Sequence, residues 1–301
     1  MLEWQSNDYI KYRLTGGMIM RTTIPELQRQ VRSGKKIAMI TAYDYAMARI
    51  ADKAGIDVVL VGDSLANTVL GYESTVPVTM DEMLHHTRPV VRGTQNALVV
   101  ADMPFMSYQV SPEIAHHNAG RFLQEGGSQA VKLEGGVVVA PTIKKIVKSG
   151  IPVMGHIGLT PQSINTLGGY RVQGKSPQKA AELLQDAIEL EQAGAFAIVL
   201  ECVPSPLARL ITEKVNVPTI GIGAGIDCDG QVQVIHDLLG FFEGFSPKHA
   251  KKYATLSETI LAALKQYIGD VSEGRFPSLE NSFDMDEELL DALYGARSEY
   301  S

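Results

Sequence analysis

The sequence has little cysteine, no long apolar run and no excess of positive charge. Of its 301 residues only two are cysteines, Cys202 and Cys228, so neither a disulfide framework nor the clustered cysteine spacing of a zinc site is expected. No stretch approaches the roughly 20 consecutive apolar residues that span a bilayer. These absences favour a reducing compartment, and we expect the protein in the cytoplasm.

The charge balance argues against two classes of partner. The formal net charge is −7, whereas general binding to nucleic acid or to anionic membranes needs clustered lysine and arginine. Hydrophobic residues make up 45% of the chain and charged residues 20%, which is ordinary for a globular protein with a large core. Small molecules are therefore the expected partners.

The first twenty residues carry Glu3 and Asp8 and lack an uninterrupted apolar segment. They resemble neither a secretory signal nor a transit peptide, which is poor in acidic residues. We expect residues 1–21 to be a poorly ordered extension and residues 275–301 to be a polar tail.

Between these ends, short β-rich apolar runs alternate with amphipathic helical stretches. Eight such runs are present: 37–43, 58–63, 97–104, 130–135, 151–158, 195–203, 217–225 and 231–237. Several of the intervening stretches open with Ser-Pro and end with Gly, as helices do. The alternation predicts an α/β fold, a single (β/α)8 TIM barrel over residues 22–274. We expect the helix between the last two runs to be short or missing. Residues 25–34 are expected to form a helix that closes the barrel bottom, and residues 255–274 are expected to form the last helix.

Polar residues stand late in these runs, where the catalytic face of a parallel barrel opens. They are Asp63, Asp102, Glu134, His156 and Glu201. A single acidic residue at a strand end is more often a helix cap or an ion-pair partner than a metal ligand. That alternative stays open for Asp63, which precedes Ser64, and for Asp102.

Lys132 and Glu134 lie two positions apart in the run AVKLEG, so they share one face of the strand. An outward pair would face the packing helices, so the inward orientation costs less. Several carboxylates at one mouth repel one another unless a cation neutralises them. Oxygen ligands without a cysteine cluster favour Mg²⁺ over zinc.

Longer motifs resemble a known family. TAYDYAMARIADKAG, LVGDSLANTVLGYESTVPVT, ADMPFMSY, VKLEGG, GHIGLTPQSINTLGGYRVQG, LECVP and IGIGAGIDCDGQVQVIHDLLG occur in order from about Thr22 to Gly274. Together they are similar to the ketopantoate hydroxymethyltransferase family. The stretch before about Met20 and the C-terminal tail depart from that pattern, so Met18 or Met20 is a candidate start.

The resemblance implies transfer of a hydroxymethyl group from 5,10-methylenetetrahydrofolate to 3-methyl-2-oxobutanoate, giving 2-dehydropantoate, in the first committed step of pantothenate synthesis. It also implies a Mg²⁺ requirement and a barrel of the phosphoenolpyruvate/pyruvate-type superfamily, related to isocitrate lyase-like enzymes. Members of the family commonly assemble as homo-oligomeric decamers.

Carried over residue by residue, the resemblance implies roles for six positions. Its metal positions fall on Asp63, Asp102 and Glu134. Its oxoacid-binding positions fall on Asp63, Ser64, Asp102 and Lys132, and its proton acceptor falls on Glu201.

The chemistry suits these roles. Mg²⁺ chelated by the oxoacid acts as a Lewis acid on the developing enolate, and whether Glu134 binds it directly or through water stays open. Lys132 supplies a compact positive charge to the substrate carboxylate or enolate oxygen, and Ser64 donates a hydrogen bond. For Glu201 to act as the base, we expect an apolar setting to raise its proton affinity.

Other features leave alternatives open. His156 either makes hydrogen bonds within the mouth or contacts the metal or the enolate. Residues 159–174 form a lid, a folate-contact loop or an interface loop. The pairs His85-His86 and His116-His117 lack metalloprotease spacing and are expected at the surface. Cys202 has no obvious paired base and is expected to be buried rather than nucleophilic.

Two rival functions compete with the transferase. The first is a Mg²⁺-dependent carbon–carbon lyase of the isocitrate lyase-like superfamily, but such enzymes usually rely on a loop cysteine that is absent from the long loops here. The second is a non-catalytic scaffold or sensor that binds a metal and an oxoacid. The presence of every residue of the catalytic set argues against it.

Overall fold

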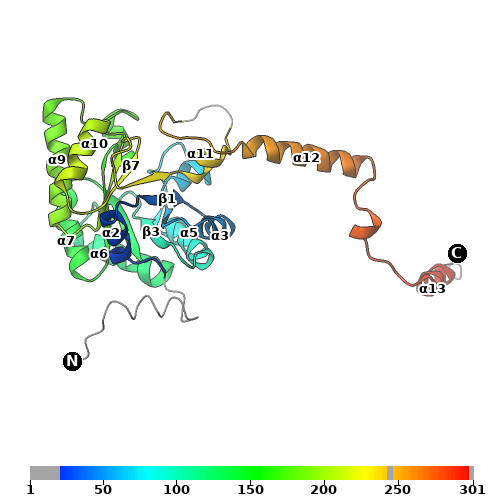
Figure 1. The fold of residues 1–301 in the computed structure, drawn as a ribbon. Helices are drawn as coiled ribbons and strands as arrows, with labels where there is room; N and C mark the ends of the chain where they lie inside the picture. Colours follow the sequence, from blue (N-terminus) through cyan, green and yellow to red (C-terminus); the bar gives the residue numbers. More distant parts are fainter. Residues whose placement is uncertain (1–20, 243–246, 298–301) are drawn as a thin grey trace. The chain divides into compact units, whose positions relative to one another are not determined.

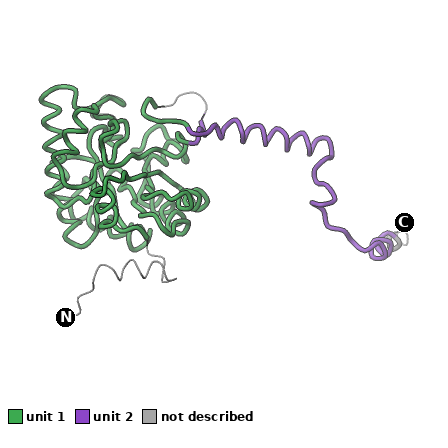
Figure 2. The backbone as a smooth tube through the Cα atoms, in the orientation of Figure 1, with its two compact units in different colours: residues 1–238, 245–252 green, residues 239–244, 253–301 purple. Residues whose placement is uncertain are grey.

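The computed structural model describes residues 21–242 and 247–297. The expected N-terminal extension, apart from residue 21, lies outside them. The chain forms two compact units, shown in Figure 2: residues 1–238 with 245–252, and residues 239–244 with 253–301. Each unit is described by itself.

The first unit is a barrel of parallel strands that closes on itself in chain order, as predicted (Figure 1). Within the described residues its strands are β1 (Ile37–Thr41), β2 (Val58–Val61), β3 (Leu98–Asp102), β4 (Ala130–Glu134), β5 (Val153–Gly158), β6 (Ala197–Glu201), β7 (Thr219–Ile222) and β8 (Gly230–Gln233). Strand β1 pairs with β2 on one side and with β8 on the other, which completes the closure.

Helices follow most strands. They are α3 (Tyr45–Lys53), α4 (Leu65–Thr68), α5 (Met80–Gly93), α6 (Pro112–Arg121), η1 (Phe122–Gly126), η2 (Val137–Val139), α7 (Ala140–Lys148), η3 (Pro161–Ser163), α8 (Ile164–Leu167), α9 (Pro177–Gln192), α10 (Ser205–Lys214) and α11 (Ile235–Leu239). Ser111 and Ser176 cap α6 and α9 with their side chains, each before a proline in the first turn. No helix separates β7 from β8, both of which lie in the described part, as predicted.

The last predicted run, 231–237, was too long at its end. Strand β8 stops at Gln233, and the Ile235 N–H donates a hydrogen bond to Thr41 Oγ1 instead of continuing the ladder. Helix α11 begins at Ile235, so the second half of the run is helical.

Helix α2 (Ile24–Arg32) packs its apolar side chains against the core inside the barrel. Glu26 accepts hydrogen bonds from Thr23 at the start of the helix, forming a capping box. Leu27, only 3% exposed, packs in one cluster with Ile37, Met39 and inward residues of the other strands. The predicted closing helix is therefore present.

The inward residues change in character along each strand. In β4, Ala130 belongs to the core cluster, and Lys132 and Glu134 follow on the same face at spacings of two. In β6, Ala197 and Val199 likewise precede Glu201. The same alternation thus builds an apolar interior and a polar mouth.

The second unit carries α12 (Leu256–Ser272), η4 (Leu279–Asn281) and α13 (Glu287–Arg297). The helix expected over residues 255–274 is present as α12, and none of its residues is buried. The tail is less polar than expected, because α13 presents Leu289 and Leu293 to solvent. None of the helices in the described ranges is long and apolar enough to cross a membrane.

We expect Leu27→Ala to lower the free energy of unfolding by about 2–5 kcal/mol, because it leaves a cavity in the interior cluster. Urea unfolding followed by circular dichroism measures the change. The control is Ile50→Ala on α3, where the side chain is 62% exposed and a change within about 0.5 kcal/mol is expected. Equal effects of the two substitutions would mean that α2 does not anchor the barrel.

Candidate active site

Charged side chains converge at the carboxyl ends of neighbouring strands. Asp102 ends β3, Lys132 and Glu134 lie on β4, His156 lies on β5 and Glu201 ends β6. The first four are each at most 5% exposed, and the Glu201 side chain is 14% exposed. The structure therefore brings together residues that are up to a hundred positions apart in the sequence.

Lys132 lies at the centre of this group. Its Nζ forms an ion pair with Asp102 Oδ1 at 2.9 Å and a hydrogen bond with His156 Nδ1 at 3.2 Å. Burial lowers the pKa of Lys132, but the charges of Asp102, Glu134 and Asp63 outweigh it and raise the pKa above its usual value. Lys132 therefore stays charged and points inward, as strand parity predicted.

Asp63 follows β2 and joins the same group through its backbone and side chain. Its N–H donates to Asp102 Oδ2 at 3.0 Å, and its own Oδ2 accepts from Gln162 Nε2 at 2.8 Å. Burial and the charge of Asp102 raise the pKa of Asp63 to about 7, against the opposing effect of Lys132. Ser64, rather than Asp63, occupies the N-cap position of the short helix α4.

Ser64 has a partner that the sequence did not reveal. Its Oγ lies 2.8 Å from the Tyr43 hydroxyl, and a Cβ at Gly62 would lie only 2.7 Å from the same Oγ. Burial raises the pKa of Tyr43 to about 12, so the phenol keeps its proton and can donate it to Ser64. When Tyr43 is the donor, the Ser64 hydroxyl keeps its own proton for another acceptor.

His156 is neutral. Burial and the charge of Lys132 hold its pKa well below the usual value. Because the Lys132 ammonium donates to Nδ1, the ring proton must reside on Nε2, which lies 3.2 Å from Glu201 Oε2. Nδ1 also lies 3.5 Å from Glu134 Oε1. The imidazole thus stands between two carboxylates.

The Glu201 side chain is largely buried, but 14% of it remains exposed to solvent. Burial raises the pKa of its carboxyl to about 7, against smaller opposing effects of the charges of Lys132 and His249. The rise expected from an apolar setting is therefore present. Near neutral pH the carboxyl can both accept and hold a proton.

The donor set fits a hard divalent cation. Asp63, Asp102, Glu134 and Glu201 bring four carboxylates to the mouth together with the ammonium of Lys132. Burial is the main cause that raises the pKa values of Asp63, Glu134 and Glu201, and neighbouring carboxylates add to the rise for Asp63 and Glu134. Within the described residues no three His, Cys, Asp or Glu side chains are arranged to hold a metal by themselves. Mg²⁺ is suited to such a site because it uses one or two carboxylates and completes its shell with water and substrate oxygens.

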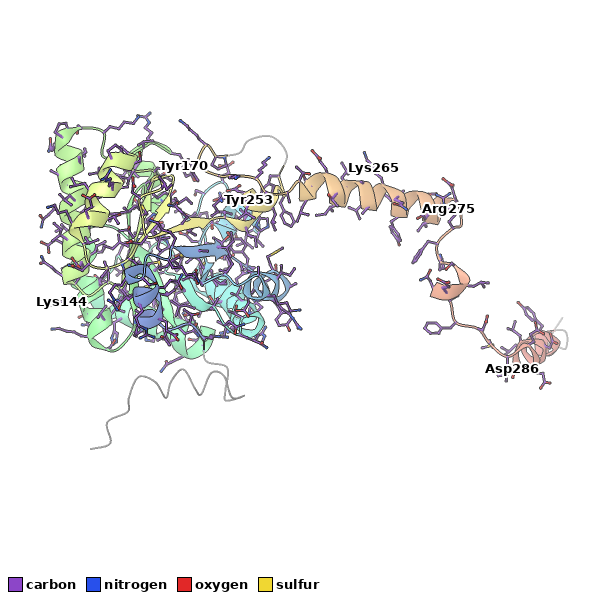
Figure 3. All side chains as sticks on the ribbon, viewed as in Figure 1. Lys144, Tyr170, Tyr253, Lys265, Arg275 and Asp286 are labelled. Carbon is purple, nitrogen blue, oxygen red and sulfur yellow. The ribbon has the colours of Figure 1, made fainter. Side chains whose placement is uncertain are left out.

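Gln162 and Tyr108 are two further buried residues of the mouth whose roles the sequence did not reveal. Gln162 contacts the carboxylates of Asp63 and Glu134, and the Tyr108 hydroxyl contacts the Gln162 amide and the Glu134 backbone. Gln162 lies inside the motif GHIGLTPQS, but nothing in the spacing of that motif indicates a contact with Asp63. Tyr170, labelled in Figure 3, lies later in the same connection and is 62% exposed. The connection therefore has both a buried anchor and an exposed part.

The remaining polar candidates do not join the site as reactive groups. Cys202 is only partly buried, and its Sγ lies 3.9 Å from His249 Nδ1, a partner that the sequence did not reveal. Burial nevertheless raises the pKa of Cys202 to about 11, so its thiol is not a ready nucleophile. His85 and His117 are exposed, as expected, whereas His86 and His116 are half-buried. His86 Nδ1 forms a hydrogen bond with the Tyr43 carbonyl.

Comparison with known proteins gives a consistent answer. A family model described as ketopantoate hydroxymethyltransferase matches residues 21–279. A protein of Dehalococcoides mccartyi strain 195, named 3-methyl-2-oxobutanoate hydroxymethyltransferase, is 61% identical over 274 residues, covering 91% of this chain and 97% of the relative. A protein of the same name from Chloroflexus aurantiacus strain J-10-fl is 58% identical over 280 residues, covering 93% and 99%.

Solved structures share the fold at low identity. Phosphonopyruvate hydrolase, solved with oxalate and Mg²⁺, has a TM-score of 0.57 at 11% identity, covering 93% of this chain and 97% of that one. A 2,3-dimethylmalate lyase, described as a member of the PEP mutase/isocitrate lyase superfamily, has a TM-score of 0.54 at 17% identity, covering 93% and 94%. These structures show that the chain shares their overall fold.

The raised pKa of Glu201 predicts a pH-dependent stability. The folded carboxyl binds its proton more tightly than the unfolded one, whose pKa is 4.5, so this contribution favours folding at low pH and is lost as pH rises to about 7. Glu201→Gln should remove it. Relative to the wild type, the metal-free variant should gain on the order of 3 kcal/mol of unfolding free energy across that window. Urea unfolding at several pH values measures this, and a difference independent of pH would contradict the assignment.

Proposed function

The chain belongs to the ketopantoate hydroxymethyltransferase family, and from this premise we propose that the barrel mouth transfers a hydroxymethyl group from 5,10-methylenetetrahydrofolate to 3-methyl-2-oxobutanoate, giving 2-dehydropantoate. The observation that carries the mechanism is the position of Glu201. Its carboxyl, with a pKa near 7, stands beside a neutral imidazole and close to a buried lysine–aspartate ion pair.

Asp63 and Asp102 would hold Mg²⁺, with Glu134 binding it directly or through water. Their fit rests on their common burial and on the hydrogen bond from the Asp63 N–H to Asp102 Oδ2, which keeps the two residues adjacent. When bound, the ion supplies Lewis acidity at the two neighbouring oxygens of the oxoacid.

Lys132 and Ser64 would orient the oxoacid. Lys132 keeps its charge in the buried mouth, where a compact ammonium attracts an anionic oxygen strongly because little water screens it. Asp102 fixes the position of that ammonium through the 2.9 Å ion pair. Tyr43 orients the Ser64 hydroxyl, which donates a hydrogen bond to the same substrate.

Glu201 would remove the proton from the substrate carbon that lies beyond the ketone. The C–H bond breaks, the proton passes to the Glu201 carboxylate, and the electron pair moves toward the carbonyl oxygen, whose charge Lys132 stabilises. The carbon that has lost its proton then forms a new bond to the methylene carbon of the folate. Both bonds from that methylene carbon to the folate nitrogens break, and a water molecule supplies the hydroxyl group. Tetrahydrofolate leaves with one proton from Glu201 and one from that water. His156 Nε2 lies 3.2 Å from Glu201 Oε2 but makes no hydrogen bond in this arrangement, so its N–H is available near the base.

The lyase alternative has less support. A carbon–carbon lyase of the related type uses a reactive cysteine, and burial raises the pKa of Cys202 to about 11. The sequence relatives are named as hydroxymethyltransferases over nearly their whole length. A pure scaffold would have no use for a base whose pKa is tuned close to neutrality.

The setting of the enzyme is also part of the proposal. We place the enzyme in the cytoplasm, where it would serve pantothenate synthesis. The free thiols of Cys202 and Cys228 suit a reducing compartment of this kind. A homo-oligomer, a decamer by family resemblance, is supported by the exposed apolar side chains of α12, such as Leu264 and Ile268.

Glu201→Gln should leave binding of 3-methyl-2-oxobutanoate largely intact and reduce its exchange with deuterium by at least about 10²-fold, because the proton acceptor is gone. Proton NMR with Mg²⁺ and without folate follows the exchange. Cys202→Ser serves as the control and should exchange at nearly the wild-type rate. Exchange retained in Glu201→Gln would refute the base assignment.

Lys132→Met should raise the KM for the oxoacid and lower kcat together, each by roughly 10-fold or more, since it removes a charge that faces the substrate and leaves Asp102 unpaired. Steady-state kinetics with each substrate varied in turn separates the effects. An unchanged KM for the oxoacid would show that Lys132 does not contact it.

A further inference from the structure

Gln162 lies in a connecting segment, yet it makes several hydrogen bonds with buried groups of the mouth. It lies in η3, between β5 and α9, and is 5% exposed. Its Nε2 donates to Asp63 Oδ2 at 2.8 Å and to the Met103 carbonyl at 2.9 Å. Its backbone N–H donates to Glu134 Oε2 at 3.1 Å. One residue thus touches two of the carboxylates assigned to the metal.

The orientation of the Gln162 amide follows from its neighbours. The Met103 carbonyl can only accept, so the group 2.9 Å from it must be the NH₂. On the other side, Oε1 accepts from the Tyr108 hydroxyl at 2.8 Å and from Gln109 Nε2 at 3.2 Å. Both hydrogens of the amide and its oxygen are therefore used, which fixes the side chain in one direction.

Gln162 also connects opposite sides of the barrel. The segment 159–173 begins and ends at β6, because the Leu159 N–H donates to the Glu201 carbonyl at 2.8 Å and the Gln173 N–H donates to the Cys202 carbonyl at 2.9 Å. Asp63 follows β2, four strands away from β6 in either direction around the closed barrel. The segment therefore reaches across the mouth, and Gln162 is its contact on the far side.

We propose that Gln162 is a positioning residue that latches segment 159–173 across the mouth and aims the Asp63 and Glu134 carboxylates at the metal and the oxoacid. By occupying Asp63 Oδ2, it leaves Oδ1 to face a ligand. By occupying Glu134 Oε2 through its backbone, it ties the same segment to β4. The inference rests on the proposed function for the identity of the ligands, but the contacts themselves do not depend on it.

A neutral amide suits this position. The Gln162 NH₂ donates one hydrogen bond to Asp63 and one to the Met103 carbonyl, and it carries no charge. The negative charge of Asp63 is therefore not neutralised and remains available to a cation. A residue that holds a metal ligand in place through such a bond typically contributes about 10–100-fold to metal affinity or activity. A side chain that only fills space would contribute nothing specific to metal binding.

The test is Gln162→Met, which keeps the length of the side chain and removes its hydrogen bonds. Binding of Mn²⁺ to the full-length protein, measured by electron paramagnetic resonance without substrates, should weaken by about 10–100-fold. The KM for the oxoacid should rise by a similar factor, and the melting temperature reports whether the variant folds. The matched control is Gln109→Met, an exposed amide that touches Gln162 Oε1 but no carboxylate of the site; its Mn²⁺ binding should change less than about 3-fold.

Tyr108→Phe provides a second route to the same answer, because it removes the donor that fixes the Gln162 oxygen. Its effect on Mn²⁺ binding should be smaller than that of Gln162→Met, and the two substitutions together should be less than additive. Unchanged Mn²⁺ affinity in Gln162→Met, or an equal loss in Gln109→Met, would overturn the proposal. Failure of the proposed function would look different: the wild type would bind Mn²⁺ but would not exchange the oxoacid proton.

Discussion

The structure depends on the burial of carboxylates at one end of an apolar barrel. Asp63, Asp102 and Glu134 are each at most 5% exposed, and Glu201 lies beside them. Placing negative charges together out of water is costly unless each has a partner. The fixed charge of Lys132 and the raised pKa values of Asp63 and Glu201 follow from that cost. So does the affinity for a cation that we propose. His156 stays neutral because its own burial and the charge of Lys132 lower its pKa.

The barrel keeps a continuous apolar core although it buries these charges at one end. Because side chains alternate along a strand, β4 and β6 give small or branched apolar residues to the interior and charged residues to the mouth. Leu27 on α2 extends the apolar cluster at the opposite end. The stability of the fold and the chemistry of the site are thus separated along one axis, although the same strands supply both.

The fold could be predicted because its signals are local. Strand runs, Ser-Pro helix starts and the parity of Lys132 and Glu134 all lie within short windows of sequence. The end of β8 could not be predicted, since it depends on a hydrogen bond between Ile235 and Thr41. The roles of Gln162 and Tyr108 were missed for the same reason: Gln162 meets Asp63 across 99 positions and Tyr108 across 54.

The backbone hydrogen bonds of segment 159–173 tie its position to that of the base. The N–H groups of Leu159 and Gln173 donate to the carbonyls of Glu201 and Cys202, so both ends of the segment are attached to the strand end that carries the base. Burial is the main reason that the pKa of Glu201 is high. Because the segment and the base share this short stretch of backbone, a substitution that displaced the segment would also change the surroundings of the Glu201 carboxyl, and with them its pKa.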